Sequence, residues 1–481
     1  MFKNLKFNKN FIYLFFIVSA ICFFSVYFKE EADIWFLLSH GKYIINHGFP
    51  YLDVLSMHTG LDFVMQQWLS SVIFYIIYEY LGKISFYVFI FLMNCLITFL
   101  IYKLCLVISD NKKFASCFIS VIAIILLQIG YIVPRPQIFT YIILLMILIM
   151  LELFSSKRKK YIYLMPILSI LLINFHASMW PILFIFCMPY VAELILKKDK
   201  DVYKLIIIMF ISLLAGFINP YGLGAMTYSI NCYGSDLIGE VVGEMRTFNL
   251  LGNPYTKVWS VFILFIFLTS NLIHLIYTKK KNFRVAHLLL FYGTFFMSLL
   301  GFRNIALFII GTVPFLVKYL DIKDTDQFIL NKKLIINYIV IILIFIGCFI
   351  SALNDKKYEF IHKADVVISY FEKNKISKDI KLYTDYSDGS IFEYHGYKPY
   401  IDSRAEVFLK KMNHKENILK EYLNFNLDEK TRDKFIKKYD FDYYVIGSMN
   451  LDLVNYLLNY DYIKYDLVFA NEEIFLIKKV S

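Results

Sequence analysis

Apolar runs of about 16 to 24 residues recur along residues 1–353 and constrain the fold more than any other feature of this sequence. Each run is close to the ~20 residues that a helix needs to cross the hydrocarbon core of a bilayer. The 481 residues are 59% hydrophobic, with a mean hydropathy of +0.57, which is too much apolar surface for one water-soluble core. The sequence therefore predicts an all-α membrane protein that crosses the bilayer many times.

We place about eleven spans by this rule, each an apolar run bounded by polar residues. The first run follows three lysines like a signal peptide, but it lacks a small-residue cleavage site, and we interpret it as a retained anchor. The run at 69–82 is shorter and more polar, which favours a helix lying on the membrane surface. The expected spans are 11–28, 84–108, 114–133, 138–154, 161–176, 179–197, 204–219, 257–277, 286–301, 304–320 and 334–353.

Lysine-rich loops set the orientation of these spans, because cytoplasmic loops collect Lys and Arg. All the clusters fall on one side when the spans alternate across the membrane. The amino terminus is then cytoplasmic, and residues 354–481 lie outside. The formal charge of +11 therefore belongs to loops that flank a membrane and does not indicate nucleic-acid binding. The clusters lie at 3–9, 112–113, 157–160, 197–200, 279–281 and 332–333.

Residues 354–481 differ sharply from the rest, with dense charges of both signs and short apolar runs. A segment of this length is large enough to fold alone. The predicted organisation is a transmembrane domain over 1–353, with its first outer loop at 30–83, followed by a small extracytoplasmic α/β domain. Its periodicity predicts helices at 365–373, 415–424 and 428–438 and strands at 380–384, 443–446 and 466–478, the last a hairpin turning at 470–473.

Polar residues other than lysine gather at the outer ends of the spans, and arginine is the clearest case. Only seven of the 50 basic residues are arginine. A guanidinium presents a planar fork of donors that suits phosphate or carboxylate oxygens, which lysine cannot imitate. A single interfacial arginine equally fits an anchor that reaches for lipid headgroups. The arginines on the outer side are Arg135, Arg246, Arg303 and Arg404.

The first outer loop carries carboxylates next to the membrane. Asp33 follows Glu30 and Glu31 and precedes an aromatic-rich amphipathic stretch, and Asp53 comes later in the same loop. Asp33 fits a helix start, where acidic side chains are favoured. It also fits a catalytic base or a ligand of a divalent cation, because a carboxylate at a low-dielectric boundary can accept a proton or hold a metal ion.

Other polar groups have plain structural interpretations that stand beside the functional ones. His176 fits a hydrogen-bonding residue at a helix end, and residues 219–222 read as a helix stop with turn chemistry. In the tail, Asp402 and Arg404 either pair with each other or belong to a loop that folds over the membrane site and helps to bind the acceptor.

The order of these motifs resembles the bacterial multispan members of the GT-C glycosyltransferase superfamily, which includes protein O-mannosyltransferases, aminoarabinose transferases and oligosaccharyltransferases. Two positions depart from the pattern, since a family-like His is Leu37 here and a frequent Glu is Gln67. More of the chemistry then falls to Asp33 and Asp53. The matching segments are 33–41, 48–56, 67–69, Arg135-Pro136-Gln137, Asn174-Phe175-His176, 219–222, Arg303-Asn304 and 400–404.

This resemblance implies sugar transfer from a polyprenyl-phosphate carrier to an envelope glycan, glycolipid or protein, on the extracytoplasmic face of a bacterial cell membrane. Asp33 and Asp53 would be catalytic, with a base or metal-ligand role and a divalent cation such as Mg²⁺ or Mn²⁺ as the possible cofactor. Cations would stabilise the leaving phosphate, and tryptophans would stack on sugar or line the lipid groove. The expected substrate-binding residues are Trp35, Trp68, Arg135, Gln137, His176, Arg246, Arg303, Asp402 and Arg404.

Two other function classes compete with this one. A glycan polymerase or ligase would share the outward-facing site but move a whole oligosaccharide. A transporter or flippase of lipid-linked sugars usually shows inverted repeats and ionisable residues near the middle of the membrane. Here the spans are nearly free of central charge and the polar residues gather at one face, which favours the transferase.

Overall fold

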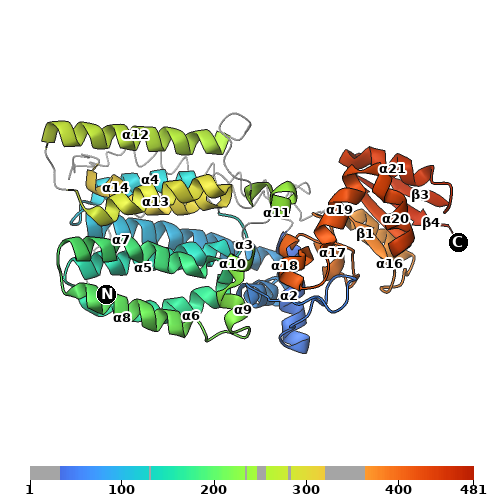
Figure 1. The fold of residues 1–481 in the computed structure, drawn as a ribbon, viewed down its shortest axis with the longest axis horizontal. Coiled ribbons are helices and arrows are strands. Elements are labelled where there is room, and N and C mark those ends of the chain that lie inside the picture. The colour runs from blue at the N-terminus through green and yellow to red at the C-terminus, as the bar shows by residue number, and fades with distance from the viewer. Residues whose placement is uncertain are drawn as a thin grey trace, which may run out of the picture. The chain divides into compact units, whose positions relative to one another are not determined.

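The computed structural model places most of the chain in helices and adds one four-stranded sheet near its end (Figure 1). Contacts divide the chain into two units, each described here by itself. The helical unit lies within Ile84–Gly222 and Gly243–Lys356, and the mixed unit combines Glu30–Lys83, Leu223–Val242 and Lys357–Ser481. The structure describes residues 33–128, 132–232, 236–245, 256–279, 283–319 and 363–480.

The helical unit consists of α-helices joined by short turns and 3-10 segments. Within it α5 packs against α6 and α7, and α13 packs against α14 and α7. Its α-helices are the second part of α3 (Trp68–Ile108), α4 (Lys113–Gln128), α5 (Gln137–Ser155), α6 (Met165–His176), α7 (Trp180–Leu196), α8 (Asp201–Ala215), α12 (Thr256–Lys279), α13 (Val285–Leu300) and α14 (Ile305–Tyr319). The 3-10 segments are η1 (Lys159–Leu164), η2 (Ala177–Met179), η3 (Gly243–Met245) and η4 (Phe302–Asn304).

Among the residues that the structure describes, four helical stretches are long and apolar enough to cross a membrane, namely Trp68–Ile108, Gln137–Ser155, Lys159–Leu196 and Phe302–Tyr319. The chain is therefore a mostly helical membrane protein, as predicted. The number of eleven spans stays a prediction. The expected spans at 11–28 and 334–353 lie outside the described residues.

Close packing joins helices α13 and α14. An added Cβ at Gly311 of α14 would lie 2.7 Å from side-chain atoms of Thr294 on α13, so only glycine allows this approach. Phe291 of α13 stacks on Phe315 of α14, with ring centroids 4.9 Å apart. At the other side of the unit α8 ends at Ala215, and the predicted helix stop follows, where Asn219 Nδ2 donates to the carbonyl of Gly216 at 2.7 Å.

Helix α3 is broken at Gly82, where φ is +81°. Glycine adopts this left-handed region at no steric cost, so it is the natural residue at such a break. The part of α3 that precedes the break belongs to the mixed unit, and the part that follows belongs to the helical unit. The segment 69–82 is thus helical, and its predicted position on the membrane surface stays a prediction.

The mixed unit begins with α2 (Asp33–His47) and a loop closed by an antiparallel bridge between Leu52 and Asp62. It continues with the short helices α9 (Leu223–Met226), α10 (Tyr228–Cys232) and α11 (Asp236–Val241). Its largest part contains helices α16 (Asp365–Lys373), α17 (Gly389–Tyr394), η6 (Ala405–Phe408), α18 (Lys410–Asn413), α19 (Ile418–Leu427), α20 (Glu429–Tyr439), η7 (Ser448–Asn450) and α21 (Leu451–Leu458).

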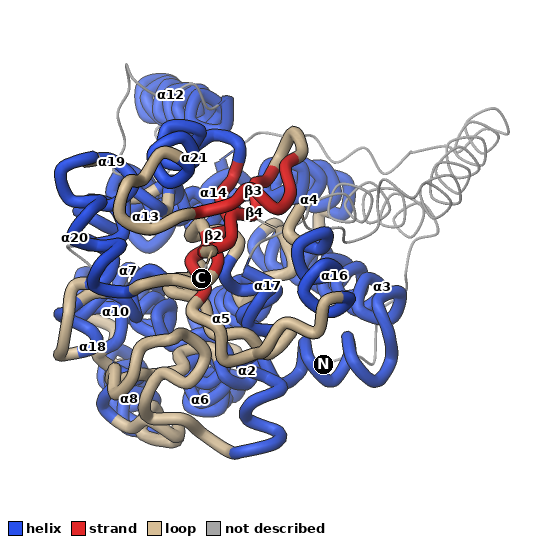
Figure 2. Tube along the Cα trace, turned by 90° about the vertical axis from the view of Figure 1, so that its right-hand side faces the viewer, coloured by secondary structure: helices blue, strands red, loops and turns tan. Residues whose placement is uncertain are grey.

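The sheet of this unit has the strand order β1-β2-β4-β3 (Figure 2). Strand β1 (Leu382–Thr384) runs parallel to β2 (Tyr443–Gly447), whereas β4 (Ile474–Lys479) is antiparallel to both β2 and β3 (Tyr465–Ala470). Every residue of β2, a central strand, is buried, and so is every residue of the edge strand β1. The predicted helix at 365–373 and the predicted C-terminal hairpin are confirmed, and the other predicted elements of the tail occur with bounds shifted by a few residues.

Candidate functional site

Asp33 is the first residue of α2 and lies in a half-exposed position. The next eight residues, from Ile34 to Gly41, are all buried, so the amino-terminal half of the helix is embedded in the mixed unit. A carboxylate in the first turn is favoured by the helix dipole. The helix-start interpretation of Asp33 is therefore confirmed, and a chemical role remains compatible with it because the side chain is not buried.

Helix α2 is held against the first part of α3 by close packing. An added Cβ at Gly41 would lie 2.3 Å from the carbonyl oxygen of Ser71. Of the two tryptophans predicted to bind substrate, Trp35 is buried against Tyr78 and Tyr394, and Trp68 has Phe49 edge-on at 5.0 Å. These rings therefore belong to the framework around Asp33.

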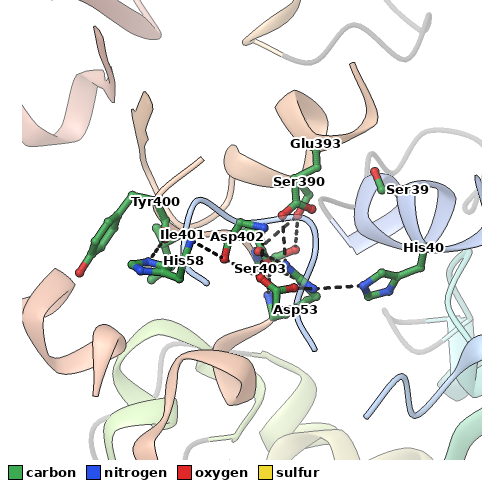
Figure 3. Close-up of polar contacts among 12 residues, drawn as sticks. Ser39, His40, Asp53, His58, Ser390, Glu393, Tyr400, Ile401, Asp402 and Ser403 are labelled. Carbon is green, nitrogen blue, oxygen red and sulfur yellow. Dashed lines mark hydrogen bonds and ion pairs between the residues drawn. The ribbon is translucent and has the colours of Figure 1, made fainter. Parts of the chain in front are cut away.

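Arg404 is the centre of a buried ionic cluster in the mixed unit (Figure 3). Its Nε and Nη2 donate to the two carboxylate oxygens of Asp402 at 2.8 and 2.6 Å. Its Nη1 donates to Asp53 Oδ1 at 2.7 Å and to His40 Nε2 at 3.1 Å, and Nη2 also donates to Glu393 Oε1 at 3.1 Å. The predicted pairing of Asp402 with Arg404 is confirmed. These contacts use all five N–H groups of the guanidinium, so the predicted contact of Arg404 with substrate has no free donor to support it.

Burial and charge set the ionisation of this cluster. Burial, then the charge of Arg404, lower the pKa of His40 well below its usual value, so His40 is neutral. Burial would raise the pKa of Asp53, but Arg404 and two hydrogen bonds from Ser56 hold it below its usual range. Burial, then the charge of Asp402, raise the pKa of Glu393 well above its usual value. The cluster thus places three carboxyl groups around one guanidinium.

A divalent cation does not fit Asp53. One carboxylate oxygen accepts from Arg404, and the other accepts from the backbone N–H and the hydroxyl of Ser56 at 3.1 and 2.5 Å. A guanidinium beside these oxygens also opposes a second positive charge. Within the described ranges, no three His, Cys, Asp or Glu side chains are grouped so that they could hold a metal ion.

Two residues of the tail, Tyr386 and Glu406, were not singled out from the sequence. Burial, followed by the charges of Asp33 and Glu406, raises the pKa of Tyr386. The Tyr386 hydroxyl donates to the carbonyl of Ser403 at 2.6 Å. Glu406 Oε1 accepts from the hydroxyl of Tyr228 at 2.7 Å. No sequence signal joins these residues to Asp33, because more than 350 positions separate them.

A second pair of acidic residues lies at the carboxyl end of β1. Asp385 Oδ2 accepts from the backbone N–H of Gly447 at 2.7 Å, and Asp388 pairs with Lys363 at 2.7 Å. Burial, followed by the charge of Asp388, raises the pKa of Asp385 to about 6. The folded state therefore favours the neutral form of Asp385, and the stability that this form contributes is lost as the pH rises through about 6.

Replacing Asp385 with Asn should remove this loss, because an amide stays neutral and its oxygen still accepts from Gly447. Relative to the wild type, the variant is expected to gain stability on the order of 2 kcal/mol above pH 7 and little below pH 4. The measurement is the thermal unfolding midpoint of the detergent-solubilised protein across this pH range. If the unfolding midpoints of the wild type and of Asp385→Asn changed with pH in parallel, Asp385 would not be the group that titrates near pH 6.

In the helical unit, polar residues gather where α5 and α14 begin and α6 ends. His176 Nδ1 shares a hydrogen bond of 2.9 Å with the hydroxyl of Thr140 on α5, which confirms its interpretation as a helix-end residue. Arg303 of η4 lies within electrostatic range of His176. Gln137 Oε1 and Arg303 Nε are buried without a hydrogen-bond partner in the described structure. Of the residues predicted to bind substrate, Arg303 thus acts electrostatically on His176, and Gln137 is the first residue of α5, the helix that Thr140 joins to His176.

Of the other predicted residues, Arg135 lies two positions before Gln137, one lies outside the described residues, and the rest belong to the mixed unit. Arg135 lies in the turn before α5, half-buried, with its backbone N–H donating to the carbonyl of Val133 at 2.6 Å. Arg246 lies outside the described residues. Asp33, Asp53, Asp402 and Arg404 belong to the mixed unit, where Asp53, Asp402 and Arg404 share one cluster.

A buried ionic cluster at the lysine-rich ends of the helices was missed from the sequence. Glu152 of α5 accepts from Arg284 at 2.6 Å and from the hydroxyl of Tyr190 at 2.6 Å, and its other contact is His287 at 2.9 Å. Glu193 of α7 accepts from Arg284 Nε at 3.2 Å. The expectation that charge is nearly absent from the spans is thus incomplete, because Glu152 and His287 are buried inside helices α5 and α13.

The fold itself has a counterpart among solved structures. It is similar to archaeal oligosaccharyltransferase AglB from Archaeoglobus fulgidus, solved in complex with an inhibitory peptide and a dolichol-phosphate, with a TM-score of 0.58 over 91% of this chain and 69% of that one. The chain has the fold of an oligosaccharyltransferase. At 11% sequence identity this likeness concerns the fold alone. No family model and no curated protein sequence matches the chain.

This likeness confirms a fold shared with a membrane oligosaccharyltransferase, whereas membership of the GT-C superfamily and the bacterial branch within it stay predictions. It also covers both units, since 91% of the chain takes part. Motif order along the sequence was therefore sufficient to indicate the fold, although each motif is short.

Proposed function

We propose that this protein is a membrane glycosyltransferase that takes a sugar from a polyprenyl-phosphate carrier and transfers it to a cell-envelope acceptor. The observation that supports this best is the fold shared over 91% of the chain with an oligosaccharyltransferase whose structure contains dolichol-phosphate. The half-exposed carboxylate of Asp33 at the start of a buried helix supplies a chemical group suited to the reaction.

In this proposal Asp33 is the base that accepts the proton of the acceptor hydroxyl as the new glycosidic bond forms. It is the better candidate of the two predicted catalytic residues, because Asp53 has both oxygens engaged by Arg404 and Ser56. The charge of Asp33 acts on the hydroxyl of Tyr386, which links this residue of the tail to Asp33 electrostatically.

The helical unit offers groups for an anionic ligand. Arg303 and Gln137 each keep a buried polar atom without a partner in the described structure, and His176 lies beside Arg303. We propose that Arg303, His176 and Gln137, with Arg135, bind the phosphate of the lipid carrier, since a fixed cation stabilises the charge that develops as phosphate leaves.

The orientation in the membrane is part of the same proposal. The lysine clusters place the amino terminus in the cytoplasm and the C-terminal domain outside a bacterial cell membrane. A lipid-linked donor reaches that face by lateral diffusion, whereas nucleotide sugars are absent there.

We also propose that a divalent cation binds at Asp33. The test is whether added Mg²⁺ or Mn²⁺ restores sugar transfer after the protein has been treated with a chelator.

A second candidate is a ligase that transfers a whole oligosaccharide. The fold shared with an oligosaccharyltransferase favours it specifically, since the donor of such an enzyme carries several sugars. Both candidates use an outward-facing site and a polyprenyl-phosphate carrier, so the size of the group that is transferred separates them.

The test compares envelope glycans and lipid-linked precursors in cells with and without the protein. Loss of one sugar with build-up of its polyprenyl-phosphate donor on the outer leaflet supports the glycosyltransferase, and build-up of a longer lipid-linked oligosaccharide supports the ligase. Donor that accumulates only on the inner leaflet would instead indicate a flippase and overturn the proposal. The leaflet is read from the access of an added glycosidase to intact spheroplasts.

A further inference from the structure

Three separate elements of the mixed unit converge on the guanidinium of Arg404. His40 comes from α2, Asp53 comes from the loop after it, and Glu393 comes from α17 (Figure 3). Arg404 is 3% exposed and each of the three carboxyl side chains around it is fully buried. A contact set of this kind fixes the relative positions of the elements that supply it, because each lost contact leaves a buried polar group unpaired.

The cluster holds more carboxyl groups than its single cation can neutralise. Asp53 and Asp402 each lie within 2.7 Å of a guanidinium nitrogen, whereas Glu393 is farther at 3.1 Å. The other carboxyl oxygen of Glu393, Oε2, is buried without a hydrogen-bond partner in the described structure. A buried oxygen without a partner is costly as part of a charged carboxylate, so this site favours the neutral, protonated form of Glu393.

His40 connects this cluster to Asp33. Nε2 of His40 accepts from Arg404, which requires a neutral ring with its proton on Nδ1. His40 lies seven residues, about two turns, after Asp33 on the same helix. A change in the position of His40 therefore moves the helix whose first residue is Asp33.

We propose that Arg404 is a positioning residue, which holds the Asp33 helix in place through His40 and Asp53, and that the clamp is complete only while Glu393 carries a proton. The proposal rests on the proposed function for its catalytic consequence, but the clamp itself does not depend on it. Loss of the Glu393 proton would leave three carboxylates around one guanidinium and would weaken the contacts that hold α2.

The sign of the pH effect follows from the groups that face Glu393. These are Asp402 and Arg404 of the tail and Asp53 of the first loop, with His40 of α2 across the guanidinium. The neighbouring residue, Tyr394, contacts two further charged groups. Its backbone carbonyl accepts from Lys42 of α2, and its hydroxyl donates to Glu79 of α3. Because burial and Asp402 raise the pKa of Glu393, the clamp is complete at low pH and is lost as the pH rises through that raised pKa.

The experiment measures amide hydrogen exchange of α2, corrected for intrinsic pH dependence, in the full-length protein in nanodiscs. In the wild type we expect protection of α2 to fall at least tenfold as the pH rises from 6 to 10. In Glu393→Gln, which stays neutral across this range, protection should stay constant within twofold. The matched control is Glu472→Gln, an exposed carboxylate in the C-terminal hairpin turn, which should follow the wild type.

Arg404 is tested in the same way with two variants. Arg404→Gln should lower the protection of α2 at least tenfold already at pH 6, and Arg404→Lys should restore part of it because one charge returns without the planar fork. In transfer assays Arg404→Gln should lower kcat more than it raises KM, and Glu393→Gln should shift or remove the alkaline fall in rate.

The outcomes separate the clamp from the enzymatic function. The proton-dependent clamp is overturned if α2 of Glu393→Gln loses its exchange protection with the same pH midpoint as the wild type. The positioning role of Arg404 is overturned if a folded Arg404→Gln protein keeps the wild-type protection of α2. If Asp33→Asn leaves glycans unchanged while the exchange results follow expectation, the clamp stands and the glycosyltransferase proposal fails.

Discussion

Replacing Asp33 with asparagine should lower the rate of sugar transfer by about 10²–10⁴-fold, the usual range for removal of a general base. The amide has nearly the same size as the carboxylate but cannot accept the acceptor's proton at neutral pH. Asparagine is also well tolerated at a helix start, so α2 should form normally. The measurement is the transfer of labelled sugar from the lipid-linked donor in purified membranes, with expression and insertion checked in parallel.

Asp461→Asn is the matched control for this change, since it makes the same substitution at an exposed position of the mixed unit. It should leave transfer within twofold of the wild type. Because Asp33 is half-exposed and begins its helix, its replacement should also leave the thermal unfolding midpoint nearly unchanged. Normal envelope glycans in cells that carry a stably inserted Asp33→Asn protein would show that Asp33 is not catalytic.

The helices of this protein could be predicted from the sequence because an apolar run of span length has few alternatives to a helix in a membrane. The strongest case in the tail is α16, where the amphipathic pattern predicted the observed bounds of Asp365–Lys373. The first residue of a helix is harder to predict where a capping side chain determines it. Helix α19 begins at Ile418 rather than 415, because Asn417 accepts from the backbone N–H of Lys420 and caps it there.

The buried ionic cluster of the mixed unit could be predicted only in its local part. Asp402 and Arg404 are two residues apart, so their pairing is visible in the sequence. Asp53 lies 351 positions from Arg404 and Glu393 contributes through a different helix, and no periodic pattern relates such positions. The identity of a long-range partner is a property of the folded chain, which explains why Asp53 was predicted to be catalytic before its arginine was known.

The buried ionic cluster around Glu152 in the helical unit could not be predicted from the sequence for a different reason. Glu152 and His287 each stand alone among apolar residues, close to a lysine-rich loop, so they look like the ordinary polar ends of spans. Burial alone distinguishes them, since both are at most 2% exposed. A charge that remains buried in an apolar helix requires a partner of opposite charge or a hydrogen bond, and this requirement joins α5, α7 and α13.

Replacing Glu152 with alanine should therefore cost about 3–5 kcal/mol of stability, the range for removal of one partner from a buried ion pair. The change leaves Arg284 without its closest carboxylate and deprives Tyr190 and His287 of a hydrogen-bond partner. We expect a marked fall in the thermal unfolding midpoint of the detergent-solubilised protein and poor recovery as a monodisperse species. Glu152→Gln should cost less, because its amide oxygen still accepts from Tyr190.

Asp199→Ala is the matched control, because Asp199 is half-buried and pairs with the exposed Lys157 in the same lysine-rich region. Exposed pairs contribute little to stability, so this variant should unfold close to the wild-type midpoint. The double variant Glu152→Met with Arg284→Met should regain much of the stability lost in Glu152→Ala, since the uncompensated cation is then absent. If Glu152→Ala unfolds no earlier than Asp199→Ala, Glu152 does not join these helices. A large loss that Arg284→Met fails to relieve would place the dominant partner of Glu152 at His287 or Tyr190 instead.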